Sequence, residues 1–122
     1  MKIPSEIRVD TSSAGLTVLE LVGEHDLASA DKLAAALAEA LACEDGIIVD
    51  LSETTFADST VINLLYRTQR ALSERGSELV VQVPAASPIL RTLEITEVIS
   101  NVTVVHDREQ ALATASAPAQ AA

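Results

Sequence analysis

The chain has 122 residues, of which 8 are basic and 18 acidic, so its formal charge is −10 at neutral pH. A chain of this length is expected to form one domain around one hydrophobic core. The negative charge disfavours nucleic acids and anionic membranes as partners, and the aromatic content of 2% leaves no platform on which nucleobases could stack.

The first half of the chain contains three segments with strand character and one with helix character. β-forming residues at 6–10 and 16–22 flank a turn rich in serine and glycine, which predicts an N-terminal β-hairpin. Leucines then recur every four residues among alanines over 29–42, which predicts a helix with Ser29 at its N-cap. The run "GIIVDL" at 46–51 is apolar on both faces, as in a central strand.

The second half continues the alternation of helix and strand. Apolar residues recur at helical spacing over 59–75, and Gly76 fits the C′ position that ends such a helix. The later segments are predicted as a strand at 77–83, a short helix at 87–95, a strand at 101–105 and a helix from 108 to 115.

This order of elements predicts an α/β fold. Short connections between consecutive strands imply right-handed crossovers and a largely parallel sheet. We expect an N-terminal β-hairpin followed by alternating helices and strands, which form a mixed, mostly parallel sheet of about five strands with helices packed on it. One domain would span residues 1–115, and an Ala- and Pro-rich tail without structure would span 116–122.

Several classes of protein are disfavoured by what the sequence lacks. The single cysteine, Cys43, cannot form a disulfide within the chain, and no cysteine and histidine cluster has the spacing of a zinc site. No signal peptide, P-loop or dinucleotide motif is visible, and no segment has the ~20 apolar residues of a membrane span. We therefore expect a cytoplasmic protein without cofactor or metal, whose oligomeric state stays open.

Polar residues gather where three predicted strands end. Because the carboxyl ends of parallel strands meet at one edge of a sheet, the loops after residues 22, 51 and 83 should lie close together. The candidate functional residues in these loops are Glu24, His25, Asp26, Asp58, Ser59 and Thr60.

Ser59 has two interpretations at the start of its predicted helix. Its hydroxyl could accept a hydrogen bond from the amide of Val61 or Ile62, as an N-cap worth ~1 kcal/mol. A phosphoryl group on the same hydroxyl would face unpaired amides and the positive end of the helix dipole. Asp26 and Asp58 could position the hydroxyl for a partner enzyme or repel a phosphate once it is attached.

Two enzyme-like alternatives start from other residues. A hydrolase could combine Ser59, His25 and Asp26, but neither a nucleophile elbow nor a glycine-rich oxyanion hole accompanies Ser59. A two-component receiver could use Asp50 near the end of an apolar strand, but the pair of acids after the first strand and the Lys-Pro of that class are missing, since Val83 precedes Pro84.

The segment "VDLSETTFADSTVINLL" resembles the STAS domain of bacterial anti-sigma factor antagonists. That family has an apolar strand, D-L-S, an apolar residue and D-S-[ST]-G before an apolar helix. Phe56 matches the apolar residue, and Asp58, Ser59 and Thr60 match the motif that follows. The segments "LVGEHDLASADKL" and "VPAASPILRTLEITEV" resemble two further family motifs in order and spacing. The resemblance covers roughly residues 6 to 114.

The resemblance implies a switch rather than an enzyme. In the family, an anti-sigma factor that is also a serine kinase phosphorylates the serine that matches Ser59. The unphosphorylated antagonist binds this kinase and frees its sigma factor, and a metal-dependent serine phosphatase restores the unphosphorylated form. We expect contacts with these partners around Ser59, at residues Glu24, His25, Asp26, Asp58, Thr60, Val61 and Asn63.

The sequence departs from the family pattern near this motif. Val61 stands where the family usually has glycine, Asn63 stands where a second glycine is common, and His25 replaces an aliphatic residue. An alternative within the same family is a scaffold or sensor-complex subunit that is not phosphorylated, in which Ser59 serves only to cap its helix.

Overall fold

The computed structural model describes residues 5–11, 15–43, 46–95 and 102–116. These residues form a six-stranded sheet in the order β1-β2-β3-β5-β6, with β4 paired to β2 off this path. β1 is antiparallel to β2, and the other strand pairs are parallel. In chain order the elements are β1 (Glu6–Asp10), β2 (Leu16–His25), α1 (Leu27–Cys43), β3 (Gly46–Asp50), β4 (Thr54–Ala57), α2 (Ser59–Ser73), β5 (Leu79–Gln82), α3 (Pro88–Ile95), β6 (Thr103–Val105) and α4 (Arg108–Ser116).

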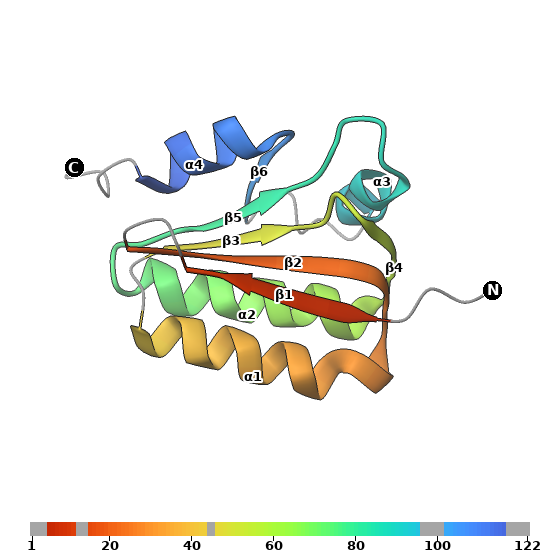
Figure 1. Ribbon diagram of the computed structural model, residues 1–122, viewed down its shortest axis with the longest axis horizontal. Coiled ribbons are helices and arrows are strands. Elements are labelled where there is room, and N and C mark those ends of the chain that lie inside the picture. Colours follow the sequence, from red (N-terminus) through yellow and green to blue (C-terminus); the bar gives the residue numbers. More distant parts are fainter. Residues whose placement is uncertain (1–4, 12–14, 44–45, 96–101, 117–122) are drawn as a thin grey trace.

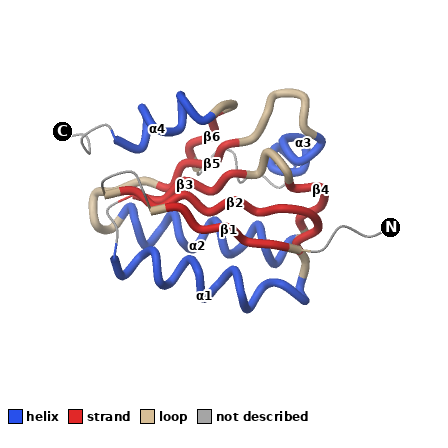
Figure 2. Tube along the Cα trace, in the orientation of Figure 1, coloured by secondary structure: helices blue, strands red, loops and turns tan. Residues whose placement is uncertain are grey.

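Helices cover both faces of the sheet (Figures 1 and 2). α1 and α2 lie side by side on one face, and α4 lies on the other face over β3 and β5. α3 lies beyond the end of the sheet, beside β4. The strands β3 and β5 point toward α3, so the carboxyl ends of the parallel strands meet at this end of the molecule.

The core is aliphatic and has two parts, one on each face of the sheet. The larger part lies between the sheet and α1 and α2, where Leu33 and Val49 have no exposed surface. The smaller part lies under α4, where Ile48 and Val80 pack with Ala111. Because β3 contributes side chains to both parts, its five residues are all buried. This explains why its sequence is apolar without alternation.

The predicted fold class is confirmed, with one strand that the sequence pattern did not reveal. The N-terminal hairpin, the parallel order and the helices on the sheet are as expected. The sheet has six strands rather than about five, since β4 forms within the segment that leads to Ser59. β4 pairs with the end of β2, and the hydroxyl of Thr54 donates a hydrogen bond of 2.6 Å to the carbonyl of Leu21.

Some predicted boundaries are wrong by a few residues. α1 begins at Leu27 rather than at Ser29, and β2 extends to His25. α2 ends at Ser73 with Glu74 as C-cap, and Gly76 follows at C″ rather than C′, with a left-handed φ of 74°. The predicted tail lies outside the described residues from 117 onward, as does most of the hairpin turn, at 12–14.

Candidate functional site

Asp58, and not Ser59, caps the start of α2. The backbone of Asp58 is extended, and its Oδ1 accepts hydrogen bonds from the amides of Thr60 at 3.0 Å and Val61 at 3.3 Å. A carboxylate also interacts favourably with the positive end of the helix dipole, which gives aspartate an advantage over serine here. Ser59 is therefore the first residue of α2, and its exposed side chain is not needed for the cap.

The second carboxylate oxygen of Asp58 joins the starts of two helices. Its Oδ2 accepts a hydrogen bond of 3.1 Å from the amide of Leu27, the first residue of α1. The amide of Asp58 in turn donates to the carbonyl of His25 at 3.2 Å, in continuation of the β2–β4 pairing. The loops after β2 and β4 are thus held together, as the positions of the strand ends predicted.

Asp26 has the same capping role at α1. Its Oδ1 accepts a hydrogen bond of 3.0 Å from the amide of Ala28, and the hydroxyl of Ser29 accepts one of 3.2 Å from the amide of Asp26. The prediction of Ser29 as N-cap is therefore wrong. Ser29 is the buried third residue of α1, and its hydroxyl accepts a hydrogen bond from the amide of the cap residue, as the third helical residue does in a capping box.

His25 is a structural residue in this loop. Its side chain has no exposed surface, with Nε2 3.0 Å from the carbonyl oxygen of Val22 and Nδ1 3.3 Å from the hydroxyl of Ser29. A carbonyl only accepts hydrogen bonds, so Nε2 carries a proton. Both ring nitrogens face groups of β2 and α1, and the hydrolase arrangement of Ser59, His25 and Asp26 is not assembled.

The other predicted site residues divide into exposed and buried ones. Asn63 is exposed one turn after Ser59, on the same side of α2, while Thr60 and Glu24 are half-buried. The side chain of Val61 is fully buried in the larger core cluster. Replacing the family's glycine by valine therefore fills the core beneath the helix and adds no bulk at the exposed surface beside Ser59.

Two exposed apolar side chains come from segments that meet near the start of α2, and the first of them, Leu27, was not among the predicted site residues. Leu27 is 73% exposed, and its amide is held by the cap residue that precedes Ser59. Phe56, the apolar residue of the family motif, is 47% exposed and lies opposite Glu24 in the β2–β4 pair. The sequence did carry a signal for Leu27, because this leucine lies off the apolar stripe of its helix.

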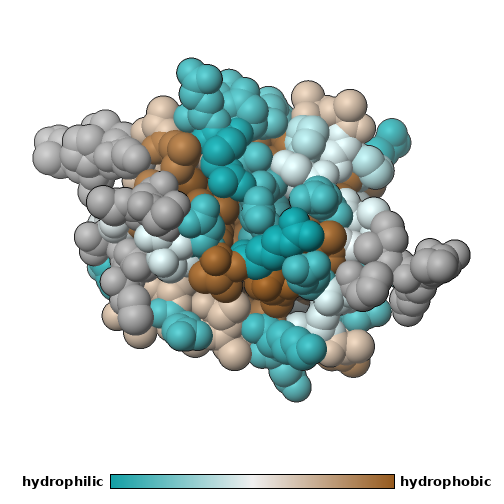
Figure 3. Space-filling model, in the orientation of Figure 1, coloured by the Kyte–Doolittle hydropathy of each residue, from teal (hydrophilic) through white to brown (hydrophobic). Residues whose placement is uncertain are grey.

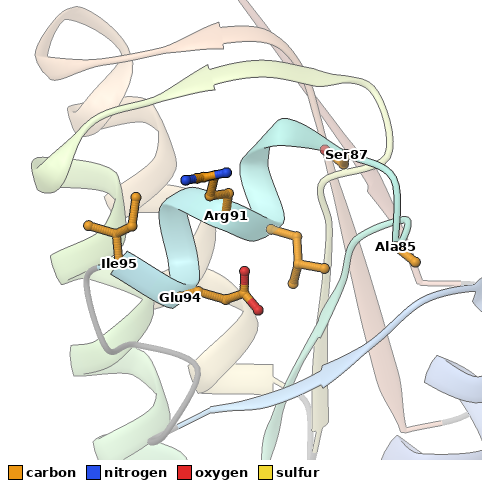
Figure 4. Close-up of a pocket in the computed structure, with 6 residues that line it drawn as sticks. Ala85, Ser87, Arg91, Glu94 and Ile95 are labelled. Carbon is orange, nitrogen blue, oxygen red and sulfur yellow. The ribbon is translucent and has the colours of Figure 1, made fainter.

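A shallow hollow lies against α3, at the end of the molecule where the parallel strands end. Its volume is about 450 Å³, and it is lined by Ala85, Ser87, Leu90, Arg91, Glu94 and Ile95. Figure 4 shows the charged groups of Arg91 and Glu94 on different sides of α3, so they do not converge on a ligand. Ile95 is 72% exposed at the end of α3, which contacts β4.

Asp50 lies on the α4 face of the sheet, in a charged cluster. Its Oδ2 is 2.5 Å from Nη2 of Arg108, and its Oδ1 accepts a hydrogen bond from the amide of Ser52. Arg108 also bonds to Glu20 and Gln82, which lie beside Asp50 in the neighbouring strands. Burial lowers the pKa of Arg108, but its bonds to Asp50 and Glu20 raise it more, to above its ordinary value.

This cluster removes the basis of the receiver hypothesis. The residue Asp50 is only 6% exposed and its carboxylate is paired with an arginine, so it offers no free oxygen to a phosphodonor. Among the residues that the structure describes, no group of three or more His, Cys, Asp or Glu side chains could hold a metal ion. Within the same residues, no helix is long and apolar enough to cross a membrane.

Comparison with known proteins gives one family match and several similar folds. Residues 7–100 match the family model described as "Mlab, STAS domain". An anti-sigma factor antagonist from Mycobacterium paratuberculosis superposes with a TM-score of 0.78 at 24% identity, covering 94% of this chain and 98% of that one.

Two solved forms of SpoIIAA have folds similar to that of this chain. Unphosphorylated SpoIIAA gives a TM-score of 0.71 at 17% identity, with 89% and 96% of the two chains covered. The phosphorylated form of Bacillus SpoIIAA gives 0.69 at 18% identity, with 89% and 98% covered. No curated protein matches the chain in sequence. Since the family model spans most of the chain and the fold agrees, this protein belongs to the STAS domain family.

Proposed function

We propose that the chain is an anti-sigma factor antagonist, a protein-binding switch in which Ser59 accepts a phosphoryl group. The observation that carries the proposal is the position of Ser59. Its side chain is exposed at the first position of α2, and Asp58 supplies the capping oxygen in its place. A phosphoryl group can therefore be added to Ser59 without removing the cap.

Phosphorylation would change the charge of this surface strongly. A phosphoserine adds about −1.5 to −2 charges, next to the carboxylate of Asp58 and close to that of Asp26. Both carboxylates are already fixed by backbone amides. The helix dipole favours the phosphate, so the modified helix stays folded while the surface around it becomes much more acidic.

The exposed apolar residues explain how the unmodified surface would bind a protein. Leu27 and Phe56 are exposed on two segments that meet near the start of α2, and both would be removed from water in a complex that covers this surface, which is favourable at about 25 cal/mol per Å² of apolar area. A phosphate on Ser59 within such an interface would have to lose its water or keep the partner away. In this proposal, phosphorylation ends binding by placing an unpaired charge inside the interface.

The proposed partners follow from the family resemblance. The unmodified chain binds an anti-sigma factor with serine kinase activity and thereby frees a sigma factor, and a metal-dependent serine phosphatase removes the phosphate. The protein contributes no catalytic residue of its own. The two solved forms of SpoIIAA, phosphorylated and unphosphorylated, support a modification of this kind within the same fold.

A binding experiment with matched variants tests the proposal. The affinity of each anti-sigma factor of the source organism is measured for the wild type, for Ser59→Ala and for Ser59→Asp. We expect Ser59→Asp to weaken binding by about a hundredfold or more, because it buries a charge without a partner, and Ser59→Ala to bind as the wild type does.

Ser73→Asp is the control, since it adds the same charge at an exposed position at the other end of α2. We expect it to bind like the wild type. Unchanged binding by Ser59→Asp would contradict the switch and favour the alternative of a scaffold or sensor-complex subunit.

A further inference from the structure

β1 lies at one edge of the sheet, and no described strand pairs with its outer side. β1 lies at the end of the strand order and pairs, among the described residues, only with β2. In Figure 1 it is the strand in front, with no described element beyond it. An edge strand carries a row of amide and carbonyl groups that a further strand can pair with, and proteins usually cover or protect such an edge.

A groove runs along this edge between β1 and α1. Its volume is about 600 Å³, and its lining includes Ile7 and Val9 of β1 together with Ala28, Ala35 and Ala36 of α1. Val9 is 58% exposed, although it points to the same face of the sheet as the core residue Leu19 opposite it. Figure 3 shows apolar side chains, in brown, in this band between β1 and α1.

We propose that β1 pairs in antiparallel fashion with β1 of a second copy of this chain, so that the two sheets form one continuous sheet. A two-fold axis perpendicular to the sheet keeps α1 and α2 of both copies on the same face. Side chains that lie directly opposite each other then point to the same face. Odd-numbered residues of β1 therefore meet odd-numbered residues of the copy, and even-numbered residues meet even-numbered ones.

The charges of β1 limit the possible registers. If Arg8 lay opposite the copy's Arg8, Glu6 would lie opposite the copy's Asp10, and every charged pair would repel. If the copy's strand is shifted by two residues, Glu6 lies opposite the copy's Arg8 at two symmetric positions. Ile7 then lies opposite the copy's Ile7 on the apolar face. The shift in the other direction pairs Arg8 with the copy's Asp10 instead. The first shift is the one proposed, and Glu6→Arg below distinguishes the two, because only the first shift places Glu6 opposite an arginine.

The proposed register extends an ion pair that exists within each chain. Nε of Arg8 lies 3.0 Å from Oε2 of Glu6, and Glu53 lies 3.7 Å from another nitrogen of Arg8. In the dimer, Glu6 and Arg8 of both copies place negative and positive charges alternately across the contact between the two β1 strands. On the opposite face, the copy's Val9 and Ile7 extend the apolar side of the groove.

The dimer is expected to be weak, since it rests on a five-residue strand and joins two chains that each carry a charge of −10. Sedimentation velocity from about 10 µM to about 1 mM measures it without any other protein. We expect the wild type and Ser59→Ala to dimerise alike, which separates this proposal from the proposed function. A chain that stays monomeric over this whole concentration range would overturn the proposal. The edge of β1 would then be available for pairing with a strand of another protein.

Two charge reversals test the register. Glu6→Arg places arginine opposite arginine and Arg8→Glu places glutamate opposite glutamate, so each variant alone should raise the dimer dissociation constant about tenfold or more. An equimolar mixture of the two should dimerise, because each arginine of one chain then meets a glutamate of the other. This recovery also shows that both variants are folded.

Glu109→Arg is the matched control, since it makes the same change of charge at an exposed position of α4. We expect it to dimerise at least as well as the wild type. Dimerisation of Glu6→Arg with unchanged affinity, or a mixture that stays monomeric while the wild type dimerises, would overturn the proposal.

Discussion

Replacing Asp58 by alanine should destabilise the protein more than the loss of an ordinary helix cap. The substitution removes the two bonds that Oδ1 accepts from Thr60 and Val61 and the bond that Oδ2 accepts from Leu27. The first two form the N-cap of α2. The third joins α2 to the start of α1, 31 residues away in the sequence.

The expected magnitude follows from these contacts. Loss of an aspartate N-cap costs ~1 kcal/mol, and loss of a further hydrogen bond costs another ~1 kcal/mol. Asp58→Ala should therefore lower the free energy of unfolding by about 2 kcal/mol. Asp58→Asn keeps one oxygen for the cap but cannot accept at both positions, and should cost about half as much.

Urea unfolding of the variants measures these differences. Asp107→Ala is the control, because the side chain of Asp107 accepts one bond, from the amide of Gln110 at the start of α4, and should cost only ~1 kcal/mol. If Asp58→Ala cost no more than Asp107→Ala, then the bond from the amide of Leu27 would add nothing to stability, and Asp58 would not join the two helices.

Two further substitutions test the core beneath the site and the cluster under α4. Val61→Gly restores the family's usual residue but removes a fully buried side chain, and should lower the free energy of unfolding by about 2–4 kcal/mol. Asn63→Gly, at an exposed position, should lower it by under ~1 kcal/mol. Equal losses in urea unfolding would contradict the burial of Val61. Arg108→Met leaves the carboxylate of Asp50 without its cation and should cost about 2 kcal/mol, less than for a fully buried pair because Arg108 is one-third exposed. Asp50→Asn in the same chain should recover part of this loss in a double-mutant cycle, and strictly additive costs would refute the pairing.

The sequence was most informative where residues near one another in the chain decide the structure. The apolar stripe of α2 includes Val61 and indicated that this side of the helix is buried. The polar junction at Asp58 and Ser59 was predicted from its position after an apolar strand. Which of these two residues caps the helix could not be decided locally, since both are good N-caps and the contact to Leu27 comes from another part of the chain.

Features that depend on contacts between distant segments were missed. The strand β4 was not predicted, because "TTFA" becomes a strand only by pairing with the end of β2. His25 was considered a possible catalytic residue because the sequence does not show that its ring lies buried against Val22 and Ser29. The cluster around Asp50 was equally hidden, since Arg108 comes from a helix 58 residues later in the chain.

The central claim is that Ser59 is a phosphoacceptor, and the most direct test is to locate the phosphate. The purified chain is incubated with ATP and each anti-sigma factor of the source organism, and its mass is measured before and after proteolysis. We predict a gain of about 80 Da on the peptide that contains Ser59, and no gain in Ser59→Ala. A chain that gains no phosphate with any of these partners, or gains it at another residue, would contradict the account.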